Sequence, residues 1–177
     1  MAPALRWVIL AMAMTMSHTV WADAVKFGPN DVQTVFVIGK SDDGNQMQYG
    51  IHLTHQCLLE GKEPVYRYWR ELDKGPNALV APTWFDGFGY GIERQTVRAD
   101  KLSVSMTIKP APTRLIEIVA RKEGEKCQAT AYTAISGKKA ELKMIFIQLS
   151  GPLSVSAITI RGVDLTSGEA VSERIVQ

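Results

Sequence analysis

The sequence predicts an all-β protein, built as an antiparallel, meander-rich β-sandwich or flattened barrel of about ten strands. Apolar and polar residues alternate along short segments, most regularly over residues 102–108, which is typical of strands that bury one face. Turn-forming residues separate these segments, as at 42–45 and 136–138. Only residues 71–81 leave room for a short helix, and Gly75-Pro76 limits its length.

Each expected strand follows from its own side-chain pattern. Apolar residues at 47, 49, 51 and 53 alternate with Gln48, Gly50 and His52, which predicts a half-buried strand. Residues 34–38, 115–120, 143–149 and 155–160 are denser in β-branched residues, as in strands buried on both faces. The expected strands occupy residues 33–40, 46–55, 64–71, 89–98, 102–108, 114–121, 127–135, 140–149, 155–162 and 169–176.

The connections between these strands are short, which favours antiparallel meanders between sequential neighbours. About 150 residues of such strands must close into a sandwich or a barrel to bury their apolar faces, and the sequence leaves both architectures open. Residues 72–88 form the longest expected loop. Unusually long loops in compact domains are often functional, so the candidate site is placed there.

Composition narrows the functional classes. The chain has 177 residues, 20 Lys and Arg against 18 Asp and Glu, and 46% hydrophobic residues. The normal apolar content excludes a disordered chain, and two cysteines exclude a disulfide-dense miniprotein. A net charge of +2 is not the basic footprint of a nucleic-acid-binding protein. One domain spanning residues 25–177 is expected.

Residues 1–24 read as a secretory signal peptide. Arg6 supplies a positive end, residues 7–16 form an apolar run, and Ala22-Asp23-Ala24 offers the small-x-small cleavage pattern. Ten apolar residues in a helix span about 15 Å, half of a ~30 Å hydrocarbon core, although an uncleaved anchor remains an alternative. No later segment is apolar enough to span a membrane. The expected location is therefore the periplasm or the extracellular medium.

Cys57 and Cys127 are the only two cysteines. In a protein bound for an oxidising compartment, one intrachain disulfide is the expected use of the pair. The alternative, a reactive thiol, would require a low-pKa environment around one of them.

Aromatic residues concentrate around the long loop. Of the twelve that follow the signal peptide, seven lie between residues 66 and 90. Flat rings with polar edges can stack on sugars or line an apolar cleft, and an arginine fork can hold a carboxylate or phosphate. The alternative is that most of these rings are core anchors. The ligand-binding candidates are Tyr68, Trp69, Arg70, Trp84, Phe85, Phe88 and Tyr90.

Metal and cofactor sites are not expected. His52 and His55 would point to opposite faces of a strand, and Cys57 is better used in a disulfide. The glycine-rich stretch 87–91 lacks the lysine and the strand–helix context of a phosphate-binding loop.

The most favoured function is a non-enzymatic binding module that acts through loop 72–90 and residues 68–70. A hydrolase that uses Asp86 and Glu93 as paired carboxylates is a second hypothesis. A structural or assembly module that pairs through an exposed edge strand is a third.

Several segments, in order, resemble the bacterial family called domain of unknown function 4833. They are Glu63–Arg70, where the family has a Pro-Val-x-x-Tyr-Trp-like strand, Tyr90–Ile92, Ile135–Lys138 with Ile145–Ile147, Gly162–Asp164, Thr166–Glu169 and Val171–Arg174. Together they cover most of residues 33–177. The resemblance implies a single secreted or surface β-domain and brings with it no activity, cofactor or catalytic residue.

Overall fold

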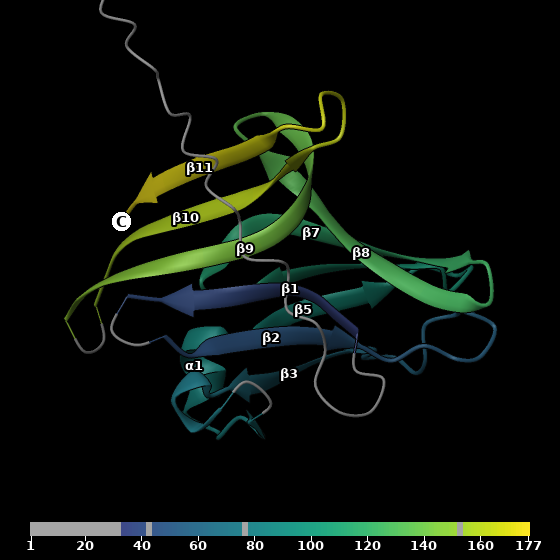
Figure 1. Cartoon of the computed structure of the whole chain (residues 1–177), viewed down its shortest axis with the longest axis horizontal. Coiled ribbons are helices and arrows are strands. Elements are labelled where there is room, and N and C mark those ends of the chain that lie inside the picture. The colour runs from purple at the N-terminus through teal and green to yellow at the C-terminus, as the bar shows by residue number, and fades with distance from the viewer. Residues whose placement is uncertain (1–32, 42–43, 76–77, 152–153) are drawn as a thin grey trace, which may run out of the picture.

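The computed structural model describes residues 33–41, 44–75, 78–151 and 154–177. In these ranges it contains eleven strands and little helix, which confirms the all-β class (Figure 1). The expected signal peptide at 1–24 lies outside the described residues. The elements are β1 (Gln33–Lys40), β2 (Gln46–Ile51), β3 (Val65–Arg70), the 3₁₀ turn η1 (Leu72–Lys74), β4 (Leu79–Val80), α1 (Asp86–Tyr90), β5 (Ile92–Val97), β6 (Ser103–Ile108), β7 (Ala111–Glu123), β8 (Lys126–Ile135), β9 (Lys138–Gly151), β10 (Ser154–Asp164) and β11 (Ala170–Val176).

All of these strands belong to one sheet that does not close into a barrel. Its main path is β4-β3-β2-β1-β9-β8-β7-β6-β5, and β10 pairs with β9 and β11 off this path. The long strand β9 pairs with β8 over residues 138–141 and with β1 over 144–147. The sheet therefore doubles over around β9, and β1 and β2 lie in front of β5–β7 (Figure 1).

Sequential neighbours pair antiparallel, as expected, except β4 and β5, which lie at opposite ends of the main path. The β1–β9 pair is parallel and was not predicted. Its register joins Val37 to Met144 and Lys40 to Ile147. Periodicity within a strand cannot reveal a pairing of this kind, because the partner lies far away in the sequence. This pair joins the amino-terminal meander to the carboxy-terminal one.

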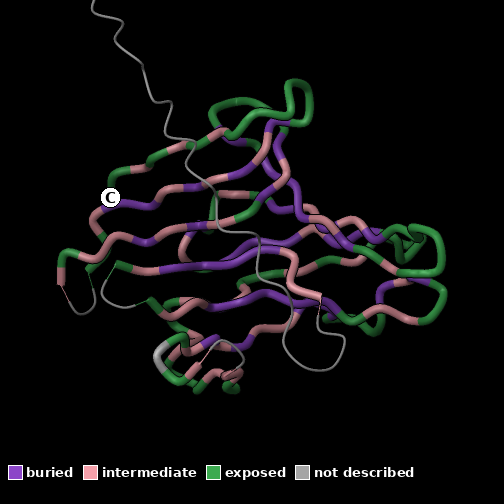
Figure 2. The backbone as a smooth tube through the Cα atoms, viewed as in Figure 1, coloured by how far each residue is buried: buried purple, intermediate pink, exposed green. Residues whose placement is uncertain are grey.

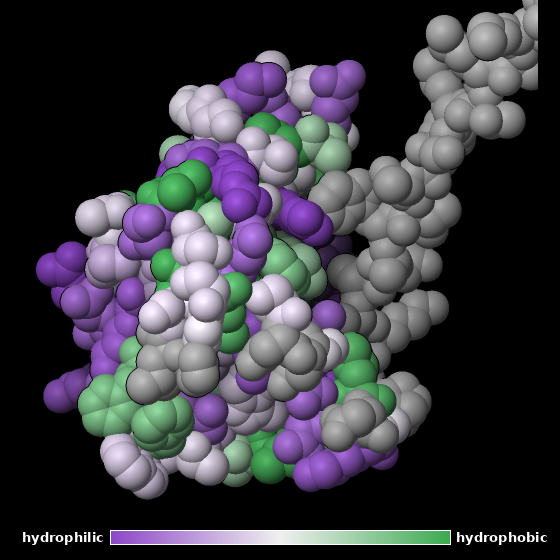
Figure 3. Space-filling view, turned by 90° about the vertical axis from the view of Figure 1, so that its left-hand side faces the viewer, coloured by the Kyte–Doolittle hydropathy of each residue, from purple (hydrophilic) through white to green (hydrophobic). Residues whose placement is uncertain are grey.

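The apolar core lies between the two halves of the folded sheet. Fully buried side chains from both halves meet there, among them Ile38, Met47, Met106, Ile118 and Ile145. Buried backbone runs along the strands, and exposure concentrates at the turns (Figure 2). The surface on the left of Figure 1 is largely hydrophilic, with a pale-green apolar patch near its lower edge (Figure 3). No helix within the described ranges is long and apolar enough to cross a bilayer.

Three expectations about burial are wrong. The segment 102–108 was expected to bury one face, but in β6 the polar residues Ser103 and Thr107 are buried as well as the apolar ones. Residues 47–51 of β2 are buried on both faces rather than on one. Gln48 can be buried on the outer face because its side-chain oxygen accepts hydrogen bonds from Thr34 and Tyr68. By contrast, β7, β9 and β10 mix buried and less buried residues, although their β-branched density suggested burial on both faces. In β1, where burial was expected over 34–38, residues 36–38 are buried and residues 34 and 35 are partly buried.

Most strand limits agree with the sequence, and the exceptions have local causes. The second strand ends at Ile51 rather than at 55, because a tight turn begins at Thr54. The fourth expected strand begins at Ile92 rather than at 89, because residues 86–90 are helical. The expected helix within 71–81 is only the 3₁₀ turn η1, and β4 was not predicted.

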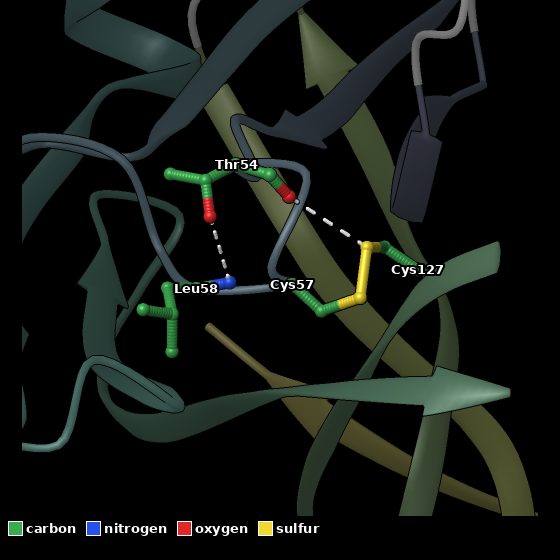
Figure 4. Close-up of a disulfide and its surroundings, with 4 residues drawn as sticks. All are labelled: Thr54, Cys57, Leu58 and Cys127. Carbon is green, nitrogen blue, oxygen red and sulfur yellow. Dashed lines mark hydrogen bonds between the residues drawn. A yellow bond between two sulfur atoms is a disulfide. The ribbon is translucent and has the colours of Figure 1, made fainter. Parts of the chain in front are cut away.

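The expected disulfide between Cys57 and Cys127 is present (Figure 4). Its Cα atoms are 5.1 Å apart and its cysteines are separated by 70 residues. The turn that presents Cys57 is held by Thr54, whose carbonyl oxygen accepts from Cys57 N–H at 2.9 Å and whose Oγ1 accepts from Leu58 N–H at 3.2 Å. The bond ties this turn to the start of β8.

Two carboxylates brace the carboxy-terminal hairpin. The hydrogen bond from Thr166 N–H is the main cause, and the ion pair with Lys138 the second, that holds the pKa of Asp164 below its ordinary value. Ser136 N–H, followed by Arg114, does the same for the pKa of Glu173. Both groups favour the folded state when they are ionised.

We expect acid to weaken this hairpin. A folded-state pKa below the unfolded value contributes stability that is fully present above about pH 5 and is lost as pH falls through the folded-state pKa. Wild type should therefore be more stable than Asp164→Asn at pH 7, and the difference should shrink progressively below pH 5. Urea unfolding of both proteins between pH 7 and pH 3 measures this, and a difference that is constant with pH would contradict it.

Candidate functional site

The short helix α1 and the turn before it are held by a reciprocal capping arrangement. The Asp86 carboxylate accepts from Thr83 N–H and from Thr83 Oγ1, both at 2.7 Å, and Thr83 Oγ1 lies 3.4 Å from Asp86 N. A hydroxyl residue and an acid three positions later satisfy each other's backbone N–H in the same way in a capping box, and here the bonds brace the turn that leads into α1. Burial acts to raise the pKa of Asp86, but the bonds from Thr83 and the Trp69 indole outweigh it and lower that pKa.

Three aromatic side chains project into solvent from this helix and from the turn before it. Trp84 is 78% exposed, Phe85 55% and Phe88 64%. They form one cluster, with ring centroids 5.6 to 6.2 Å apart in edge-to-face arrangements. We call Trp84, Phe85 and Phe88 the ring cluster. The apolar patch in Figure 3 lies at the level where Figure 1 places α1. A contiguous exposed apolar patch commonly marks an interaction site.

The carboxy-terminal end of α1 is anchored to the core. The Tyr90 C=O accepts hydrogen bonds from the buried Tyr49 hydroxyl at 2.7 Å and from Arg67 Nη1 at 2.9 Å. The Tyr90 ring meets Trp69 edge to face, with centroids 5.0 Å apart. Burial raises the pKa of the Tyr49 hydroxyl, which therefore remains a donor. The ring cluster thus stands on a fixed base.

An open groove of about 560 Å³ lies beside α1, between the edges of β3 and β5. Its walls are Val65–Arg67 and Ile92–Gln95, and Gly87, Gly91 and Lys109 close the end next to the helix. Lys109 Nζ also lies 5.2 Å from the centre of the Phe88 ring, so the groove and the ring cluster adjoin. Gly91 permits this junction, because a Cβ there would lie 2.3 Å from the Gly87 carbonyl oxygen.

Side chains, rather than backbone-to-backbone hydrogen bonds, bridge the two walls of this groove. Gln95 reaches across from β5, accepting from Val65 N–H at 3.2 Å and donating to Val65 C=O at 3.4 Å. Arg67 reaches across from β3 to the Tyr90 carbonyl. Sequence reasoning missed both residues. Each occupies an ordinary strand position, so no signal in the sequence could have revealed its partner.

The structure divides the seven predicted ligand-binding residues into three groups. Trp84, Phe85 and Phe88 form the exposed ring cluster, while Trp69 and Tyr90 are anchors packed against the core. Tyr68 and Arg70, only 7% and 6% exposed, lie on the opposite face of β3 from Trp69. These two are not brought together with the ring cluster.

The comparisons with known proteins give one result. A family model described as Domain of unknown function (DUF4833) matches residues 36–174, which is most of the protein. The chain belongs to the DUF4833 family. No curated protein and no solved structure matches it. The matched span of the DUF4833 domain includes the ring cluster, the groove and both cysteines, and it confirms the resemblance found from the sequence.

The two carboxylates of the hydrolase hypothesis lie in different surroundings. Asp86 is engaged by Thr83, and its pKa is lowered. Glu93 lines the groove and Asp86 does not.

His52 and Cys57 each have another partner. His52 stacks on Tyr66 with centroids 4.2 Å apart, and Cys57 is used in the disulfide. Within the described ranges, no three His, Cys, Asp or Glu residues gather as metal ligands.

Proposed function

We propose that this DUF4833 domain is a non-enzymatic binding module, exported from the cytoplasm, whose ligand contacts the ring cluster and the adjoining groove. The observation that carries the proposal is that Trp84, Phe85 and Phe88 are more than half exposed yet mutually packed, on a turn and short helix that are braced by Asp86 and anchored to the core. Large aromatic side chains are enriched among the residues that dominate binding energy at interfaces. A rigid presentation of this kind lowers the entropy lost on binding.

The polar groups of the groove support a ligand with both apolar and polar parts. Glu63, Arg67, Glu93, Arg94 and Lys109 line it, three cations against two carboxylates. Binding sites commonly combine an apolar contact surface with a few polar groups that fix orientation. The ring cluster would supply the first and the groove the second.

Removing the central ring should weaken binding strongly. A glycan array and a thermal-shift ligand screen on wild type would identify ligands, and Trp84→Ala should lower their affinity at least tenfold, as truncation of a binding hot spot does. The fold should remain, because Trp84 is exposed and its loss should cost no more than about 1 kcal/mol of stability.

The matched control is Leu115→Ala. Leu115 is 59% exposed on β7 and is not part of the ring cluster. It should leave ligand binding unchanged. Equal affinity of wild type and folded Trp84→Ala for every ligand found would remove the ring cluster from the binding site.

The exported location is supported by the leader pattern at 1–24 and by the Cys57–Cys127 disulfide, a bond that persists in oxidising compartments. Cell fractionation with sequencing of the mature amino terminus tests it, and the expected mature protein starts at Val25. Recovery of an uncleaved protein with two free thiols in the cytoplasm would refute it.

A further inference from the structure

The groove separates the edge of β3 from the edge of β5, two strands of the folded sheet that are not paired with each other. Val65 is bridged to Gln95, and Arg67 is bridged to Tyr90 just before β5. From Val65 to Arg67 the residue number increases along β3, while the facing residue changes from Gln95 back to Tyr90. The two edges are therefore antiparallel. In the described part of the protein no backbone-to-backbone hydrogen bond joins them. A glutamine side chain stands between them instead.

The backbone groups of β3 that face this groove can be assigned from its ladder. Pro64 C=O accepts from His52 N–H, so even-numbered residues of β3 direct their N–H and C=O toward β2. Odd-numbered residues direct theirs the other way, which is why Trp69 pairs with Val80 of β4. The N–H and C=O of Val65 and Arg67 therefore face the groove.

The Gln95 amide offers Val65 what a neighbouring strand would offer. Its carbonyl oxygen accepts from Val65 N–H and its NH₂ donates to Val65 C=O. A residue in a hydrogen-bonded pair of an antiparallel ladder makes these same two bonds with a peptide backbone. An inserted strand would lie about 4.8 Å from β3, which is the space that the end of the Gln95 side chain occupies.

We propose that the groove receives an extended segment of a partner polypeptide, which adds to β3 as a further strand and displaces the Gln95 amide from Val65. This deepens the proposed function, on which it rests, by naming the ligand class of the same site. Strand addition at an exposed edge takes its affinity from backbone hydrogen bonds and its specificity from pockets for side chains.

The side chains around the groove specify the segment further. At the α1 end, Lys109 lies against Phe88 of the ring cluster, so this end offers a cation and apolar rings together. At the other end Glu63 precedes Val65. Charge complementarity therefore favours a segment with an acidic residue and an apolar residue at its α1 end.

The test uses a phage-displayed library of random linear dodecapeptides, selected on the intact, disulfide-bonded protein. Selected peptides are synthesised, and their affinities are measured for wild type, Gln95→Ala and Trp84→Ala. Gln95→Ala should bind about three- to tenfold more tightly than wild type, because the peptide no longer competes with two internal hydrogen bonds. A glutamine with a purely structural role would give the opposite sign.

Two further measurements keep the test decisive if Gln95→Ala folds poorly. Peptide binding to wild type should slow amide hydrogen exchange at Arg67, and N-methylation of alternate peptide residues should abolish binding. Gln95→Met, which keeps the length of the side chain without its amide, should repeat the gain in affinity. Thr96→Ala, an exposed neighbour on β5, should leave affinity unchanged.

Failure of this inference differs from failure of the proposed function. If no peptide is selected, or if binding ignores Gln95 and backbone methylation, strand addition at β3 is overturned. The binding role of the ring cluster still stands if Trp84→Ala weakens a glycan or other ligand from the screens. If bound peptides slow amide hydrogen exchange in β11 rather than in β3, the proposed site is wrong and the peptides pair with the edge strand β11. Ligands insensitive to Trp84→Ala would overturn the binding role of the ring cluster, and strand addition at β3 would still be decided by the Gln95 variants and by backbone methylation.

Discussion

Replacing Cys57 and Cys127 together by serine is expected to lower the free energy of unfolding by about 4 kcal/mol. The disulfide closes a loop of 70 residues, and in the chain-entropy model cross-links over loops of this size contribute on the order of 4 kcal/mol by restricting the unfolded polypeptide. Urea unfolding of oxidised wild type and of the double variant measures the difference. We expect the midpoint to fall with little change in secondary structure.

Two comparisons isolate the covalent bond from the side chains. Wild type under strong reduction should unfold close to the midpoint of the double variant, because both then lack the same cross-link. A single Cys57→Ser variant should match the double variant unless the remaining thiol joins two molecules, which non-reducing electrophoresis would reveal. A loss below about 1 kcal/mol would mean that the unfolded polypeptide is already confined by other contacts.

The second large effect is expected from Gly162→Ala. A Cβ at this position of β10 would lie 2.1 Å from the Glu141 carbonyl oxygen and 2.8 Å from Ile135 Cδ1. The first contact is with the backbone of the neighbouring strand β9, so relief requires the β9–β10 ladder to shift at its irregular point between Arg161 and Gly162. We expect a loss of about 3 kcal/mol, at the upper end of overpacking costs.

Gly89→Ala provides the control for this substitution. Gly89 lies in α1, and a Cβ there would meet nothing within 4 Å. Alanine has the higher helix propensity, so stability should stay level or rise by up to about 1 kcal/mol. Thermal unfolding of both variants beside wild type is sufficient. Equal stability of Gly162→Ala and wild type would show that β9 and β10 yield easily at this point.

Sequence patterns were sufficient for nearly every strand of this fold, because alternation and turn residues act locally. The segment Ser103–Ile108 shows why, since its polar and apolar residues alternate and its limits match the expected strand closely. The parallel pairing of Val37 with Met144 could not be predicted. This pairing depends on how two distant meanders pack, and the residues of neither strand indicate which strand will be its partner.

The candidate site was predictable only in part. The density of rings near residue 85 led to Trp84, Phe85 and Phe88, but could not separate these exposed rings from the anchors Trp69 and Tyr90. That separation depends on α1, which is five residues long and rich in glycine, and on the turn before it, which Thr83 and Asp86 brace. No periodic pattern in the sequence reveals so short a helix. The bridge from Gln95 to Val65 exists only once β3 and β5 are in place.

The β1–β9 pairing also has a kinetic consequence. Residues more than one hundred positions apart must meet before the first strand acquires its second neighbour, and contacts so distant in sequence slow folding to the millisecond-to-second range. The carboxy-terminal hairpins can form from nearby residues alone, whereas the first strand gains this neighbour only after β9 has been synthesised. During that interval the edge of β1 is open to other polypeptides, and crowded conditions would favour aggregation there over completion of the sheet.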